Sequence, residues 1–105
     1  MKVLFDQGTP VPLRRSLPGH TVDTAFELGW ATLRNGELLN RAEAEGYDLL
    51  ITTDQQLRHQ QNLSGRRLAI LVLRSTSWPR IQARVGAIRE TISRTQPGEY
   101  QELAI

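Results

Sequence analysis

The chain has 105 residues, of which 39% are hydrophobic and 23% charged, and it contains no cysteine. This size and composition are typical of one globular domain, and they exclude a second core, disulfide bridges, thiolate catalysis and sulfur-ligated zinc. No apolar run approaches the roughly 20 residues that span a bilayer, and Asp6 interrupts the N-terminal apolar run too early for a secretory signal. We therefore expect a single domain, residues 1–105, in the cytoplasm.

The net charge of +2 is unevenly distributed along the chain. Residues 1–54 carry five basic and eight acidic side chains, whereas residues 55–105 carry eight arginines and three glutamates. Twelve of the thirteen basic residues are arginine, whose planar guanidinium suits phosphate better than an ammonium group does. This pattern favours an anionic polymer as partner, although arginine-rich helices can also arise from coding bias and form ordinary solvated faces.

The first half of the chain predicts strands and helices in alternation. Residues 2–5 are a short apolar strand, a turn follows, and Pro10 opens a helix over residues 10–17. Residues 20–24 alternate as a second strand would, and residues 25–34 stay open between a helical turn and a loop. Asn35 is a candidate cap for an amphipathic helix that Gly46 ends.

The second half continues this alternation. Residues 47–53 and 68–73 contain continuous apolar runs, which are typical of strands covered on both faces in a parallel sheet. A short polar helix over residues 55–61 separates them. Ser77 caps a single last helix that runs to Pro97, and residues 99–105 form an edge strand or a loose tail. The apolar stripe of the last helix consists of Ile81, Val85, Ile88 and Ile92. The order βαβαβαβ predicts an α/β fold.

Acidic residues follow two of the predicted strands. In open parallel sheets the ligand lies outside the carboxyl ends of the strands, and Asp6 and Asp54 come directly after such ends. Glu37, at the start of the helix before the third strand, is a candidate third carboxylate. Three carboxylates held together repel one another and need a cation, and hard oxygen ligands select Mg²⁺ or Mn²⁺.

Each acidic residue also has a structural explanation. Asp54 can cap the short helix after it, and Glu37 can complement the dipole of its own helix. Asp6, which ends a buried strand before a glycine turn, has fewer structural duties and is the strongest functional candidate.

Five segments resemble, in order, the small bacterial PIN-like proteins of unknown function. They are Val3-Leu4-Phe5-Asp6, Leu28-Gly29-Trp30, Asn35-Gly36-Glu37-Leu38-Leu39, Ile51-Thr52-Thr53-Asp54 and Leu71-Val72-Leu73-Arg74. The resemblance covers nearly the whole chain and implies a three-layer α/β/α sandwich with a mostly parallel central sheet. It further implies a metal-dependent ribonuclease, often the toxin of a toxin–antitoxin pair, with Asp6, Glu37 and Asp54 as catalytic and metal-binding residues.

The chain departs from the PIN-like pattern at two positions. Gln7 and Gln56 stand where such proteins usually carry an acid after the first strand and two residues beyond the Thr-Thr-Asp. The carbonyl oxygen of Gln56 can still bind a metal ion or its water, but it supplies no charge. We expect weaker metal affinity, and a shared fold does not by itself transmit an activity.

Metal-assisted hydrolysis of RNA also needs contacts to phosphate. Arg74, which follows the strand over residues 68–73, is the best-placed candidate, and Arg58, Arg66 and Arg67 are further candidates for the RNA backbone. The resemblance adds an antitoxin protein and a homodimer as partners.

Two other functions compete with the ribonuclease. A catalytically weak PIN-like module would bind RNA or protein without cleaving RNA, as Gln7 and Gln56 allow. A phosphoacceptor receiver domain is set aside, because it needs an acidic pair after its first strand and a lysine near the sheet end, whereas the only lysine here is Lys2.

Overall fold

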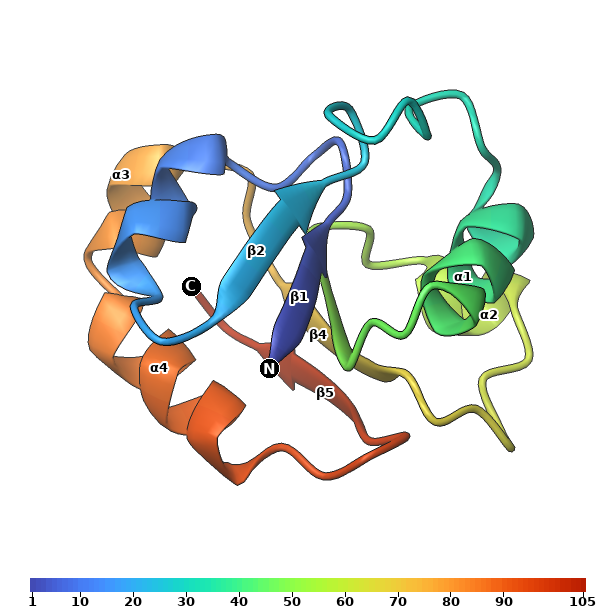
Figure 1. The fold of residues 1–105 in the computed structure, drawn as a ribbon. Coiled ribbons are helices and arrows are strands. Elements are labelled where there is room, and N and C mark those ends of the chain that lie inside the picture. The colour runs from blue at the N-terminus through green and yellow to red at the C-terminus, as the bar shows by residue number, and fades with distance from the viewer.

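The computed structural model describes residues 1–105, the whole chain. Five strands alternate with four α-helices and one 3-10 helix, η1 (Figure 1). In chain order they are β1 (Lys2–Phe5), η1 (Val11–Ser16), β2 (Thr21–Thr24), α1 (Asn35–Ala44), β3 (Leu49–Thr52), α2 (Leu57–Gln60), β4 (Ala69–Leu73), α3 (Trp78–Gln82), α4 (Val85–Arg94) and β5 (Tyr100–Leu103). None of the helices has the length and apolar character needed to cross a membrane.

All five strands belong to one parallel sheet in the order β2-β1-β3-β4-β5. The chain first adds β2 on one side of β1, then returns to add β3 on the other side, so the strand order reverses between β1 and β3. Phe5 pairs with Ile51 across these two strands. The residues that follow β1 and β3 therefore emerge beside each other, at the reversal point where ligands of parallel sheets bind.

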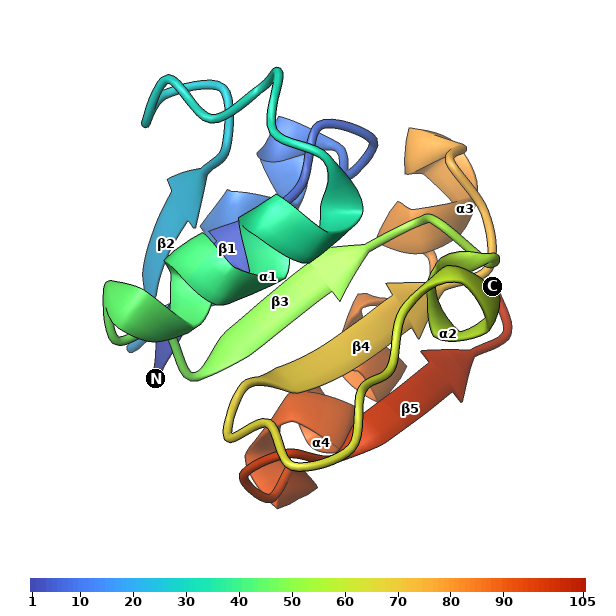
Figure 2. The ribbon, with the colours of Figure 1, turned by 90° about the vertical axis from the view of Figure 1, so that its right-hand side faces the viewer.

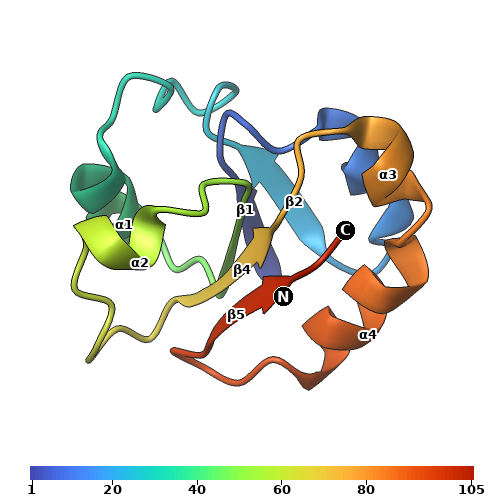
Figure 3. The ribbon, with the colours of Figure 1, turned by 180° about the vertical axis from the view of Figure 1, so that it is seen from behind.

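Helices cover both faces of this sheet. Successive strand residues point to opposite faces, so Val3 and Phe5 enter one core cluster while Leu4 enters the other. The first cluster packs under η1, α3 and α4, and the second under α1 and α2 (Figures 1 and 3). Burial of both faces explains the continuous apolar runs of β3 and β4. The molecule is an α/β fold with an all-parallel sheet, compatible with the predicted three-layer sandwich.

The last crossover has the opposite hand to the others. The connections from β2 to β3, β3 to β4 and β4 to β5 all advance in the same direction across the sheet. The first two pass over the face covered by α1 and α2, whereas the third passes over the other face, as Figure 2 shows. Such a mixture is rare, because about 98% of these crossovers are right-handed. It brings α3 and α4 onto the same face as η1.

The structure confirms the predicted strands and refines the rest. Residues 99–105 contain the edge strand β5, and residues 25–34 form turns without a helix. The prediction of a single last helix was wrong. The chain leaves helical geometry at Arg84, with φ −113° and ψ 16°, so the segment forms two helices, α3 and α4. Asn35 does not cap α1, because it is the first helical residue and its side chain bonds elsewhere.

Candidate functional site

Asp6 lies where β1 ends, and two threonine hydroxyls hold its carboxylate. Thr9 Oγ1 donates to Asp6 Oδ1 at 2.8 Å, and Thr52 Oγ1 donates to Asp6 Oδ2. Thr52 is the last residue of the neighbouring strand β3, and it is 1% exposed. The pairing of β1 with β3 therefore fixes the position of the Asp6 side chain at the edge of the sheet.

Burial dominates the electrostatics of Asp6. It raises the pKa of this carboxyl above the ordinary value of 3.8, although hydrogen bonds from Thr52, Thr9 and the Gly8 backbone act in the opposite direction. No arginine or lysine forms an ion pair with Asp6. A partly buried carboxylate without a cationic partner attracts either a proton or a cation.

Asp54 follows β3 at the same edge and is anchored to the same threonine. Its backbone N–H donates to Thr52 Oγ1 at 3.1 Å. The Asp54 side chain accepts from Asn35 Nδ2 at 3.0 Å and from the Gln56 backbone N–H at 2.9 Å. Asp54 does not cap α2 as considered above, because the N-cap residue of that helix is Gln56. Neither contact of the Asp54 side chain is an ion pair.

Glu37 and the two glutamines are held less firmly. Glu37 is exposed in the first turn of α1 and makes no side-chain hydrogen bond or ion pair. Gln56 is exposed beside Asp54, and Gln7 is exposed beside Asp6. No three Asp, Glu or His side chains form a group that could hold a metal ion. The metal-binding and catalytic roles of the sequence-predicted carboxylates stay predictions.

Two cavities border Asp6. The smaller, about 120 Å³, is lined by Gln7, Trp30 and Asn35 among others. The larger, about 290 Å³, extends from Asp6 to Phe26, whose side chain is 74% exposed. Sequence reasoning missed Phe26, because residues 25–34 show no periodicity.

The four arginines predicted to contact RNA lie in different places. Arg74 is exposed at the carboxyl edge, where its Nε donates to Gln55 Oε1 at 3.4 Å. Arg58 pairs with Glu102 at 3.5 Å. Arg66 and Arg67 precede β4, at the opposite edge of the sheet, and Arg66 pairs there with Glu43 at 3.6 Å. Arg74 is therefore the predicted arginine that shares the edge of Asp6 and Asp54 and has no ion pair.

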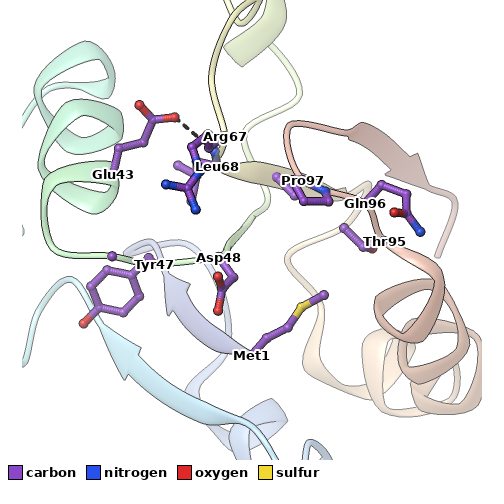
Figure 4. Close-up of a pocket in the computed structure, with 11 residues that line it drawn as sticks. Met1, Glu43, Tyr47, Asp48, Arg67, Leu68, Thr95, Gln96 and Pro97 are labelled. Atoms are coloured by element: carbon purple, nitrogen blue, oxygen red, sulfur yellow. Dashed lines mark hydrogen bonds between the residues drawn. The ribbon is translucent and has the colours of Figure 1, made fainter.

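Another cavity, about 420 Å³, lies at the amino ends of the strands (Figure 4). Arg67 and Asp48 contribute to its wall, together with Glu43, whose Oε1 accepts from the Leu68 backbone N–H at 3.0 Å. Its charges are of both signs, which selects no particular ligand. Because parallel sheets bind ligands at their carboxyl ends, the cluster around Asp6 is the stronger candidate site.

Comparison of the chain with protein-family models, curated proteins and solved structures gives no significant match. The PIN-like resemblance therefore stays a prediction.

Proposed function

We propose that the protein is a metal-dependent ribonuclease in which Asp6 and Asp54 bind the metal ion that cleaves RNA. The observation that carries this proposal is that the two aspartates follow adjacent parallel strands at the point where strand order reverses. The Thr52 hydroxyl contacts the carboxylate of Asp6 and the backbone N–H of Asp54. An inhibitory protein partner and a homodimer rest on the resemblance alone and stay predictions.

The two carboxylates fit a hard cation for which the protein supplies only some of the ligands. Mg²⁺ usually keeps several waters and binds one or two carboxylates together with phosphate oxygens of the substrate. Asp6 and Asp54 are two carboxylates without ion pairs, and no third acidic side chain joins them. The substrate phosphate would therefore complete the coordination, and metal affinity without RNA would be weak.

The side chains around the aspartates hold the site in position. Thr9 and Thr52 orient the two oxygens of Asp6, and Asn35 orients Asp54. A bound Mg²⁺ or Mn²⁺ would activate water and neutralise charge that develops on the phosphate. The exposed Arg74 guanidinium lies at the same edge and would bind a phosphate oxygen.

RNA binding without cleavage is the second candidate function. It is favoured by Gln7 and Gln56, which line or flank the site and supply no negative charge. The two functions differ in one measurable property, because only the ribonuclease requires a divalent cation for turnover.

The test compares Asp6→Asn and Asp54→Asn with the wild-type chain on a mixed-sequence single-stranded RNA, with Mn²⁺ or with chelator. Mutation of residues that merely support a metal ligand costs about 10–100-fold, so we expect each variant to lose more than roughly 100-fold in cleavage. Asp48→Asn is the matched control, since Asp48 immediately precedes β3 at the opposite edge. Calorimetric titration with Mn²⁺ in the presence of a non-cleavable RNA gives a readout independent of turnover.

Cleavage that persists in both variants, or in the presence of chelator, contradicts the ribonuclease proposal. RNA binding by the wild-type chain without any cleavage supports the second candidate instead.

A further inference from the structure

The two helical layers carry very different charges. The segments 11–16 and 78–94, which form η1, α3 and α4, contain six arginines and one acid, Glu90, for a net charge of +5. Helices α1 and α2 on the other face contain two arginines and two glutamates, for a net charge of zero with histidine neutral. The modest net charge of the chain therefore conceals one strongly basic layer.

Four of the six arginines in this layer have no acidic partner. Arg14 pairs with Glu27, and Arg94 pairs with Glu90 at 2.8 Å. The other four are exposed and form no ion pair, and we call them the arginine face: Arg15, Arg80, Arg84 and Arg89. Protein surfaces normally intersperse both signs of charge, so four unneutralised guanidinium groups on one layer indicate an anionic partner.

Tertiary contacts hold the arginine face together. Helix α3 packs against η1, and Arg89 Nε donates to the carbonyl oxygen of Ser16, at the end of η1, at 2.6 Å. Arg80 and Arg84 are four residues apart across the turn between α3 and α4. The reversed hand of the last crossover is what brings these distant segments to one face of the sheet (Figure 3).

We propose that the arginine face binds the phosphate backbone of RNA. A regular polyanion matches several separate guanidinium groups, each of which presents a planar fork suited to phosphate. A membrane is the less suitable partner, because only Val11 of the exposed large hydrophobic side chains lies in this layer. The exposed large hydrophobic residues of the chain are Met1, Val11, Phe26 and Leu28.

This proposal rests on the proposed function and names how its substrate is held. Both η1 and α3 follow strands at the carboxyl edge, after β1 and β4 respectively. Val11, at the start of η1, lines the same 290 Å³ cavity as Asp6. A single strand of RNA that lies along the arginine face would therefore reach Asp6 at one end of that face.

The test measures RNA binding apart from cleavage. Arg80→Gln/Arg84→Gln is compared with Arg34→Gln/Arg41→Gln, a control pair that removes the same charge at α1. Binding of a fluorescent single-stranded RNA is followed by anisotropy, with chelator present and over a range of salt concentrations. Each lost phosphate contact reduces the slope of log affinity against log salt by about 0.7 for a single strand, so the first pair should lose about 1.4. At 0.1 M salt this corresponds to roughly 25-fold weaker binding.

An unchanged slope in Arg80→Gln/Arg84→Gln, or an equal loss in the control pair, overturns the proposal. Binding of the wild-type chain to phosphatidylserine vesicles but not to RNA also overturns it. If the wild-type chain binds RNA in a salt-dependent way and Arg80→Gln/Arg84→Gln loses this binding, the result supports the proposal. If no cleavage occurs in that case, the ribonuclease proposal is rejected while RNA binding by the arginine face is supported. If Arg80→Gln/Arg84→Gln still cleaves RNA and binds it as the wild-type chain does, the ribonuclease proposal is supported and RNA binding by the arginine face is rejected.

Discussion

The Asp6 carboxylate is partly buried, has no ion-pair partner and accepts two hydroxyl hydrogen bonds. Such a group stabilises the fold poorly, because two neutral donors compensate only part of the cost of removing a charge from water. A residue of this kind persists where function requires it, and its replacement often stabilises the protein. Stability measurements on Asp6 therefore carry information about function.

We expect Asp6→Asn to be more stable than the wild-type chain at neutral pH, by about 0.5–2 kcal/mol, the usual range for stabilising substitutions. Burial raises the pKa of Asp6, so the folded protein binds this proton more tightly than the unfolded chain does. The loss of stability caused by the ionised Asp6 carboxylate is complete above the pKa of the folded protein and vanishes below the ordinary value of 3.8. The advantage of the variant should therefore shrink as the pH falls, as urea unfolding at about pH 7 and about pH 3 would measure.

A variant that is less stable than wild type at neutral pH would count against this account of Asp6, as would a stability difference that stays constant across the pH range. The Asn side chain keeps an oxygen that can accept from a threonine hydroxyl, so loss of hydrogen bonding alone does not produce the expected trend.

The positions of Asp6 and Asp54 were predictable, because each follows an apolar run that reads as a strand end. The hydrogen bonds of Thr52 and Asn35 were not predictable, since they join segments whose contact depends on which strands are neighbours. Phe26 was missed for a different reason: turns without a repeating pattern leave no periodic signal in the sequence.

At the scale of elements, the connection between α4 and β5 depends on one glycine. Gly98 has φ +76°, and a Cβ atom added there would lie 2.5 Å from the backbone oxygen of Arg66. Gly98 also donates its N–H to the Arg67 carbonyl at 2.8 Å. This close approach ties the turn before β5 to the segment that leads into β4.

We predict that Gly98→Ala destabilises the protein by about 2–4 kcal/mol, since a positive φ costs about 1 kcal/mol or more and overpacking adds about 1–3. Gly46→Ala is the matched control, because Gly46 ends α1 with φ +79° and has no atom within 4 Å of the added Cβ. The control should lose only about 1–2 kcal/mol. Equal losses in the two variants by chemical denaturation would show that the contact with Arg66 is unimportant.

Element types were easier to predict than their geometry. The strands follow from apolar runs whose two faces are both buried, and Gly46 at the end of α1 follows from its conformational freedom. The division of the last helix at Arg84 was missed, because the apolar stripe from Ile81 to Ile92 continues through the break. The hand of the last crossover has no local signal at all, since it depends on which face still has apolar surface to cover.

At the scale of the whole molecule, the two faces of one sheet form two separate core clusters of 12 residues each. Every central strand contributes to both clusters through its alternating side chains. The layers are therefore distinct in their side-chain contacts but share the strands that hold them. This arrangement predicts a protein that unfolds as one unit, although its two faces differ in charge and in the helices that cover them.

Two tryptophans allow this prediction to be tested, because Trp30 belongs to the cluster under α1 and Trp78 packs against the cluster under η1. Leu13→Ala, at a fully buried residue of η1, should cost about 2–5 kcal/mol. Unfolding is followed by the fluorescence of one tryptophan at a time: Trp30 in a Trp78→Phe background, and Trp78 in a Trp30→Phe background. We expect Leu13→Ala to lower the urea midpoint equally in both backgrounds. A shift seen only by Trp78 would show that the layers unfold independently. The control is Leu39→Ala in α1, which should shift both tryptophan signals in the same way. In the double variant the two losses of unfolding free energy should add within about 0.5 kcal/mol, because residues on opposite faces share no side-chain partners.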